Sequence, residues 1–221
     1  DNLNLSVRAG EVMGVAGVGG NGQTEISEAI LGLREDISGN IILDHRDVTG
    51  VSIGQRRQSG LRTVPADRFG YALLSDFRAY ENLALTDIPL NAYGSYWRLS
   101  RNKMKQNAHA MFSVKQITGG NPTTRTRLLS GGNAQKLLLA RELDKDASVL
   151  VAHSPTRGLD VRAHQAVHKS ILDAVHNDTA CLLISEDLDE VLQLSTRICV
   201  ISRGELSGPY SKDEIDRARI G

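Results

Sequence analysis

The sequence is poor in cysteine, in net charge and in long apolar runs, and each shortage argues against a class of protein. Its two cysteines, Cys181 and Cys199, stand inside the apolar stretches ACLLIS and RICVIS, at a spacing that fits no metal site. We expect both to be buried thiols in strands. The 26 basic residues equal the 26 acidic ones, so no overall field attracts nucleic acid or an anionic membrane. No apolar run reaches the roughly 18 residues of a membrane span.

What the sequence does contain is a regular exchange between apolar runs and helical patterns. The short apolar runs predict buried strands at 11–17, 60–65, 149–154, 180–185 and 197–202. Periodic apolar residues predict helices at 22–33, 131–143 and 163–175. Residues 39–48 predict a strand or one arm of a hairpin. Wholly apolar strands separated by helices are typical of an α/β fold built on a buried, mostly parallel sheet.

The stretch 69–128 differs in character and predicts a mostly helical insertion. It has few β-branched runs, carries a helix-prone segment at 101–112, and is interrupted by Pro or Gly at 89, 94 and 119–122. A chain of 221 residues is long enough for one domain with such an inserted subdomain.

A glycine-rich loop between the first predicted strand and the first predicted helix is a candidate phosphate site. Its backbone N–H groups can converge on an anion at a helix N-terminus. The P-loop pattern has a lysine next to last, where this chain has Gln23, which can donate a hydrogen bond but brings no charge. Phosphate binding is then weakened about tenfold or more. Thr24 can still offer its hydroxyl to Mg²⁺. A glycine-rich turn without a ligand is the alternative. The candidate nucleotide-binding residues are Gly17, Val18, Gly19, Gly20, Asn21, Gly22, Gln23 and Thr24.

A second glycine motif is far more specific. Residues 129–133 read Leu-Ser-Gly-Gly-Asn, and Pro-Thr-Arg-Gly-Leu-Asp follows at 155–160. With these motifs the chain resembles the nucleotide-binding domain of ATP-binding-cassette (ABC) transporters over its whole length. In that family Leu129, Ser130, Gly131, Gly132 and Asn133 form the signature, whose N–H groups face the γ-phosphate of ATP bound to the opposite domain. A simple helix cap is the alternative.

The resemblance also assigns Asp160 to the D-loop, which reaches across the cassette dimer interface. Asp160 can serve at the same time as the N-cap of the helix that follows.

At the remaining motif positions, each departure from the family pattern removes a group that the family uses for catalysis. The Walker B strand should end in Asp-Glu and here ends in His153-Ser154, which is a poor substitute for a magnesium ligand and a general base. Ala66 stands where the family has its loop glutamine, and Glu186 stands where it has its switch histidine. The Glu186 carboxylate repels a γ-phosphate. No catalytic residue is therefore intact, and we expect the isolated chain to hydrolyse ATP very slowly or not at all.

Within the family, the combination of VPADR, LSGGN, PTRGLD and ISEDLDE resembles the C-terminal cassette of fused two-cassette importers of ribose-like sugars or nucleosides. This resemblance implies a RecA-like P-loop core at 1–68 and 137–221, with an N-terminal antiparallel β part, and a helical signature subdomain at 69–136. It also implies an N-terminal partner cassette in the same polypeptide, permease subunits contacted near 66–81, and a place at the cytoplasmic face of the membrane. The chain starts without Met, so we expect an excised cassette.

Two other hypotheses stay open. The first is a soluble ABC-fold ATPase of translation or DNA repair, which we would expect to carry basic segments or zinc cysteines. The second is a non-hydrolysing module that binds a partner cassette and no nucleotide of its own. Gln23 and Glu186 favour that module, whereas the glycines and Thr24 oppose it.

Overall fold

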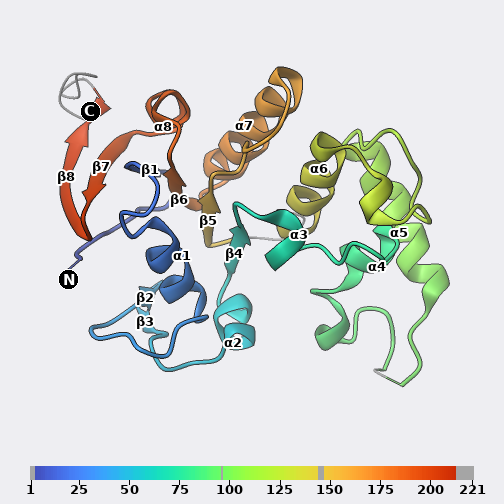
Figure 1. Cartoon of the computed structure of the whole chain (residues 1–221). Coiled ribbons are helices and arrows are strands. Elements are labelled where there is room, and N and C mark those ends of the chain that lie inside the picture. Colours follow the sequence, from blue (N-terminus) through green and yellow to red (C-terminus); the bar gives the residue numbers. More distant parts are fainter. Residues whose placement is uncertain (1–2, 96, 144–146, 213–221) are drawn as a thin grey trace. The chain divides into compact units, whose positions relative to one another are not determined.

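The computed structural model describes residues 3–95, 97–143 and 147–212. It divides the chain into two compact units (Figure 1). Unit 1 comprises Asp1–Ala66, Asp146–Pro155 and Ser170–Gly221, and unit 2 comprises Asp67–Lys145 and Thr156–Lys169.

Unit 1 is built on a six-stranded sheet in the order β4-β5-β6-β1-β7-β8. The first five strands in this order pair in parallel, and β8 runs antiparallel to β7. The predicted α/β fold with a mostly parallel sheet is thus confirmed. The strand bounds are Val12–Ala16 for β1, Leu61–Val64 for β4, Val149–His153 for β5, Ala180–Ser185 for β6, Arg197–Ser202 for β7 and Glu205–Ser211 for β8.

The sheet is apolar on both faces because helices cover both. On one face Met13 and Val15 of β1 belong to a core cluster with Ile26 and Ile30 of α1 (Gln23–Leu31). On the other face Ala16 packs in a second cluster with α8 (Leu188–Leu194). This two-sided burial explains why central strands such as β1 and β6 are almost wholly apolar rather than alternating.

Four features of unit 1 differ from the sequence expectation. Residues 39–48 form only a hairpin of two short strands, β2 (Ile42–Leu43) and β3 (Arg46–Asp47). Helices α2 (Ile53–Gln58) and α8 were not predicted, because each is under eight residues long. Strand β8 was missed because it contains Gly-Pro, normally a turn signal. An edge strand tolerates proline, since its outer N–H groups have no partner.

The regular structure of unit 2 is helical. Its helices are α3 (Arg68–Tyr71), α4 (Ala79–Ala84), α5 (Arg101–Val114), α6 (Gly131–Glu142) and the first half of α7 (Val161–His176), with two 3₁₀ turns at Ile88–Leu90 and Thr126–Leu128. Buried Asn82 of α4 ties the second of these turns to the segment after α3, because its amide donates to Thr126 Oγ1 at 2.8 Å and to the Leu74 carbonyl at 2.9 Å. No helix among the described residues is both long and apolar enough to cross a membrane.

Arg56 is the largest polar side chain buried in the core of unit 1. Its side chain is 1% exposed and its guanidinium faces backbone carbonyls. Nη1 donates to Ala29 and Ile30 in the last turn of α1, at 2.7 and 2.6 Å, and Nη2 donates to Thr49 at 2.7 Å. The cation therefore neutralises the negative end of the α1 dipole while it anchors α1 to the segment after β3.

We expect Arg56→Ala to lower the free energy of unfolding by about 3 kcal/mol, because it leaves several buried carbonyls without a donor. Arg56→Lys should recover only part of the loss, since one ammonium cannot reach both α1 and Thr49. Chemical denaturation measures both. Arg46→Ala, an exposed arginine of the same unit, is the control and should cost little. A loss no greater than that of the control would contradict this role.

Candidate functional site

The parallel register brings most of the predicted site residues of unit 1 to one edge of the sheet. Ala16 pairs with Ser185, and His153 pairs with Ile184, so β1, β5 and β6 end side by side. The glycine loop 17–22, His153-Ser154 and Glu186 follow these strand ends directly. Ala66 lies two residues beyond β4, whose Val64 pairs with Ala152 of β5. The carboxyl edge of a parallel sheet is where α/β proteins bind their ligands.

The interior of the glycine loop is occupied by the chain's own Gln23. Its side chain is 3% exposed, and it turns back into the loop instead of toward solvent. Nε2 donates to the Val18 carbonyl at 2.9 Å, and Oε1 accepts the Asn21 N–H at 3.0 Å. The amide thus satisfies one acceptor and one donor of the loop, so the Asn21 N–H and one N–H of the Gln23 amide are used inside the loop.

Glu186 adds a negative charge beside the same loop. A Cβ built on Gly19 would lie 2.7 Å from Glu186 Oε1 and 3.1 Å from its Cδ, which places the carboxylate against the loop backbone. An anion approaching these N–H groups meets a like charge at close range. Both features are expected to weaken the binding of a triphosphate by the loop.

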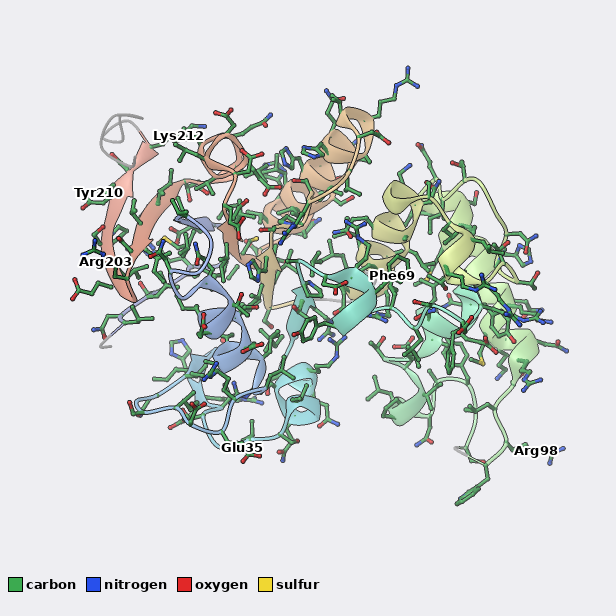
Figure 2. The ribbon with its side chains drawn as sticks, in the orientation of Figure 1. Glu35, Phe69, Arg98, Arg203, Tyr210 and Lys212 are labelled. Atoms are coloured by element: carbon green, nitrogen blue, oxygen red, sulfur yellow. The ribbon has the colours of Figure 1, made fainter. Side chains whose placement is uncertain are left out.

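The loop is also tied to the far side of the sheet edge. Asn21 Oδ1 accepts the Arg203 N–H at 2.8 Å, and the Asn21 carbonyl accepts the Gly204 N–H at 3.1 Å, which joins the loop to the β7–β8 turn (Figure 2). Gly17 has no room for a side chain, since a Cβ would lie 2.5 Å from the Ile201 carbonyl. The loop therefore keeps a fixed shape against β7.

The end of β5 fits magnesium poorly. Ser154 is buried, holds a φ of 43°, and donates its N–H to the Ile184 carbonyl at 2.7 Å. His153 and Ser154 offer an imidazole and a hydroxyl where a hard divalent cation prefers carboxylate oxygen. Thr24 is exposed at the start of α1 and could contribute one further hydroxyl. The described residues contain no group of three or more His, Cys, Asp or Glu side chains arranged for a metal.

The signature residues lie in unit 2 at the N-terminus of α6. Ser130 is the exposed N-cap, and its Oγ accepts the Asn133 N–H at 3.4 Å and the Asn133 amide at 2.9 Å. Leu129 is buried beneath them, and Asn133 Oδ1 also accepts the Thr118 N–H at 2.9 Å. The first turn of a twelve-residue helix presents the positive end of its dipole here, which suits an anion.

The start of α7 packs against the start of α6. A Cβ on Gly132 would lie 2.8 Å from Ala163 Cβ, so this glycine lets the two helices approach closely. A Cβ built on the preceding residue, Gly131, would lie 3.6 Å from Leu159 Cδ2. Asp160 Oδ1 accepts the Ala163 N–H at 2.9 Å, which makes Asp160 the N-cap of α7. The helix-cap role expected for Asp160 is confirmed.

Both cysteines are buried, as predicted, and neither forms a disulfide. Burial raises the pKa of the Cys181 thiol to about 12, so it stays protonated and unreactive at neutral pH. The partners of Gln23 and of Arg68 in α3, by contrast, could not be predicted from the sequence, because the first depend on how the loop closes on its own side chain and the second lie far away in the chain.

The fold and the motif geometry define a P-loop ATPase-like α/β protein. Residues 1–157 match the family model described as ABC transporter, and the chain belongs to this family.

Its relatives are import proteins. The chain is 40% identical over its whole length to the glucose import ATP-binding protein TsgD13 of Haloferax volcanii, of which it covers 40%. It is 36% identical to the guanosine import ATP-binding protein NupO of Bacillus subtilis, covering 43% of that protein. A ribose import ATP-binding protein RbsA of Halalkalibacterium halodurans is 30% identical and is covered to 44%. The chain thus spans less than half the length of these curated relatives.

Solved cassettes share the fold at low sequence identity. A nucleotide-free ATP-binding cassette from an ABC transporter superposes with a TM-score of 0.78 at 20% identity, covering 94% of this chain and 83% of that one. A dimeric bacterial ABC transporter cassette gives a TM-score of 0.77 at 18% identity, covering 96% and 89%.

Because cassettes of this family handle ATP, Glu186→Gln should tighten binding of MgATP to the chain about tenfold, by removing the charge beside Gly19. Titration calorimetry measures the affinity. Glu35→Gln removes an exposed carboxylate elsewhere in unit 1 and is the control (Figure 2). Equal affinities for Glu186→Gln and the control would show that the carboxylate does not obstruct the loop.

Proposed function

We propose that the chain is an ATP-binding cassette of an importer for simple sugars or nucleosides, and that it completes the ATP site of a partner cassette through its signature. Family membership and the import proteins among its relatives support the transport role. The observation that carries the proposal is the contrast between the two glycine motifs. The Ser130 turn presents a helix N-terminus, whereas the Gly17–Thr24 loop is filled by Gln23.

The chain's own site is proposed to be degenerate. Gln23 and Glu186 disfavour the triphosphate, and Ala66, His153 and Ser154 lack the groups that orient magnesium and activate water. Nucleotide held by residues 17–24 then serves mainly to stabilise closure of the two cassettes. In this arrangement the chain's residues bind and orient, and they move no proton.

The partner is proposed to be an N-terminal cassette of the same polypeptide, with this chain as the C-terminal one. The relatives are more than twice as long as this chain, which leaves room for a second cassette of similar size. The two would close head to tail, so that Ser130–Asn133 and Asp160 face the partner's nucleotide. Residues 69–136 would form the signature subdomain that moves with this closure.

The permease is proposed to dock on the segment 69–77. Four large apolar side chains are exposed within these nine residues of unit 2, namely Phe69, Tyr71, Leu74 and Phe77 (Figure 2 labels Phe69). Such a cluster is unusual on a surface that faces only water. Docking there would place the chain at the cytoplasmic face of the membrane through its permease subunits.

In an assembly of the two cassettes, Ser130→Arg should lower the rate of ATP hydrolysis by a factor of about 10², because it blocks the anion site that faces the partner's γ-phosphate. Thr24→Ala, in the chain's own loop, is the matched control and should have a much smaller effect. Phosphate release measures both. Hydrolysis by the isolated chain that is fast and lost in Thr24→Ala would overturn the degenerate site. Ser130→Arg without effect would favour a module that only binds its partner.

Tyr71→Arg should reduce recovery of the permease with the cassette about tenfold, as expected for loss of an aromatic anchor. Tyr71 is 67% exposed, so the substitution should leave the fold intact. Val114→Arg changes another exposed apolar residue of unit 2, 74% exposed at the end of α5, and is the control. Co-purification from detergent is the measurement. Equal recovery with both variants would place the permease contact elsewhere.

A further inference from the structure

Arg68, the last residue of the VPADR motif, bridges two segments that are distant in sequence. Its Nε donates to Gln135 Oε1 at 2.9 Å, and its Nη2 donates to the Arg157 carbonyl at 2.6 Å. Gln135 lies one turn inside the signature helix α6 and is 1% exposed. Arg157 lies in the loop that leads to Asp160. One guanidinium thus holds both segments that the proposed function directs at the partner's nucleotide.

The guanidinium also brings charge to the signature turn. Nη1 lies 3.4 Å from the position of a Cβ built on Gly131. Burial lowers the pKa of Arg68, with the nearby Asp67 carboxylate opposing the shift, but a guanidinium remains protonated at any physiological pH. A fixed cation beside the turn favours an anion on the N–H groups of Gly131 and Gly132.

The backbone around Arg68 is itself held in place. Asp67 is the N-cap of α3, and its Oδ1 accepts the N–H groups of Phe69 and Gly70 at 3.1 and 2.9 Å. Arg68 therefore starts from a fixed turn, directly before the exposed Phe69 and Tyr71. A displacement of this turn would be transmitted through the Arg68 hydrogen bonds to both α6 and the loop before α7.

We propose that Arg68 is the positioning residue that sets the signature turn relative to the Asp160 loop and links both to the exposed 69–77 segment. This inference rests on the proposed function. It does not require Arg68 to touch nucleotide. Its role depends on the two-pronged geometry of the guanidinium, which lysine cannot reproduce because one ammonium cannot span Gln135 and the Arg157 carbonyl.

Hydrogen exchange on the chain tests the bridge without a partner. Arg68→Lys and Gln135→Ala should each speed amide exchange about tenfold in residues 129–135, and Arg68→Lys should do so in 156–162 as well. Arg127→Ala is a stringent control, because Arg127 is close to the signature in sequence but pairs with exposed Asp76 at 3.1 Å. If the Arg68→Lys pattern matches that of the control, the bridge does not position these segments.

The double variant Arg68→Lys/Gln135→Ala separates positioning from a general loss of folding. If the two residues act through one contact, exchange in 129–135 should be no faster in the double variant than in Arg68→Lys alone. Effects that multiply across the whole of unit 2 would mean that Arg68 is only a stability residue, and would overturn the proposal.

ATP hydrolysis by the two-cassette assembly gives the functional readout. Arg68→Lys should lower kcat about tenfold or more while KM changes much less, because the signature acts after nucleotide has bound. An unchanged kcat in a variant whose residues 129–135 and 156–162 exchange faster would contradict the positioning role of Arg68. Failure of the proposed function gives a different result. If the signature does not complete the partner's ATP site, Ser130→Arg also leaves hydrolysis unchanged, and the hydrogen-exchange results still show whether the Arg68 bridge exists.

Discussion

The parallel register of β4, β5, β6 and β1 determines which loops can meet in unit 1. Each strand ends at the same edge, so the loops after Ala16, His153 and Ser185 become neighbours although they are distant in sequence. Helix α1 continues from the first of these loops, and its position fixes the loop. Arg56 binds two backbone carbonyls at the carboxyl end of α1 and the Thr49 carbonyl after β3, and Gln23 at the amino end of α1 binds the Val18 carbonyl. The loop itself is tied to the sheet edge through Asn21, which accepts the N–H groups of Arg203 and Gly204.

The departures from the family pattern are physically consistent with one another. With no lysine in the loop, the Val18 carbonyl and the Asn21 N–H need partners, and the Gln23 amide supplies both in one side chain. A neutral loop also tolerates the Glu186 carboxylate that lies against Gly19. The end of β5 carries no carboxylate either, since His153 and Ser154 stand where the family pattern has its acidic pair.

Much of the fold could be predicted because burial on two faces leaves a strong pattern. Runs such as ACLLIS and RICVIS appear as central strands, and GGNAQKLLLAREL becomes α6. Short or edge elements left a weak pattern, as α2, α8 and the proline-containing β8 show. The positions of the candidate site residues in the sequence were predicted from their motifs, but the contacts that their side chains make were not. Whether Gln23 faces a ligand or its own loop depends on loop closure, and the Arg68 contacts join residues 67 and 89 positions apart.

The two glycine motifs differ most clearly in the charge that the protein places beside them. At the loop of unit 1 a carboxylate oxygen lies 2.7 Å from the position of a Cβ on Gly19, whereas in unit 2 a guanidinium nitrogen lies 3.4 Å from that position on Gly131. A carboxylate disfavours an anion at the loop beside it, and a guanidinium favours one at the turn beside it, because the two charges have opposite signs. Both motifs contain glycines before a helix, so backbone geometry alone does not separate them. The neighbouring charges do, because a carboxylate lies beside the loop and a guanidinium beside the signature turn, and this supports the proposal that the signature turn is the better anion site.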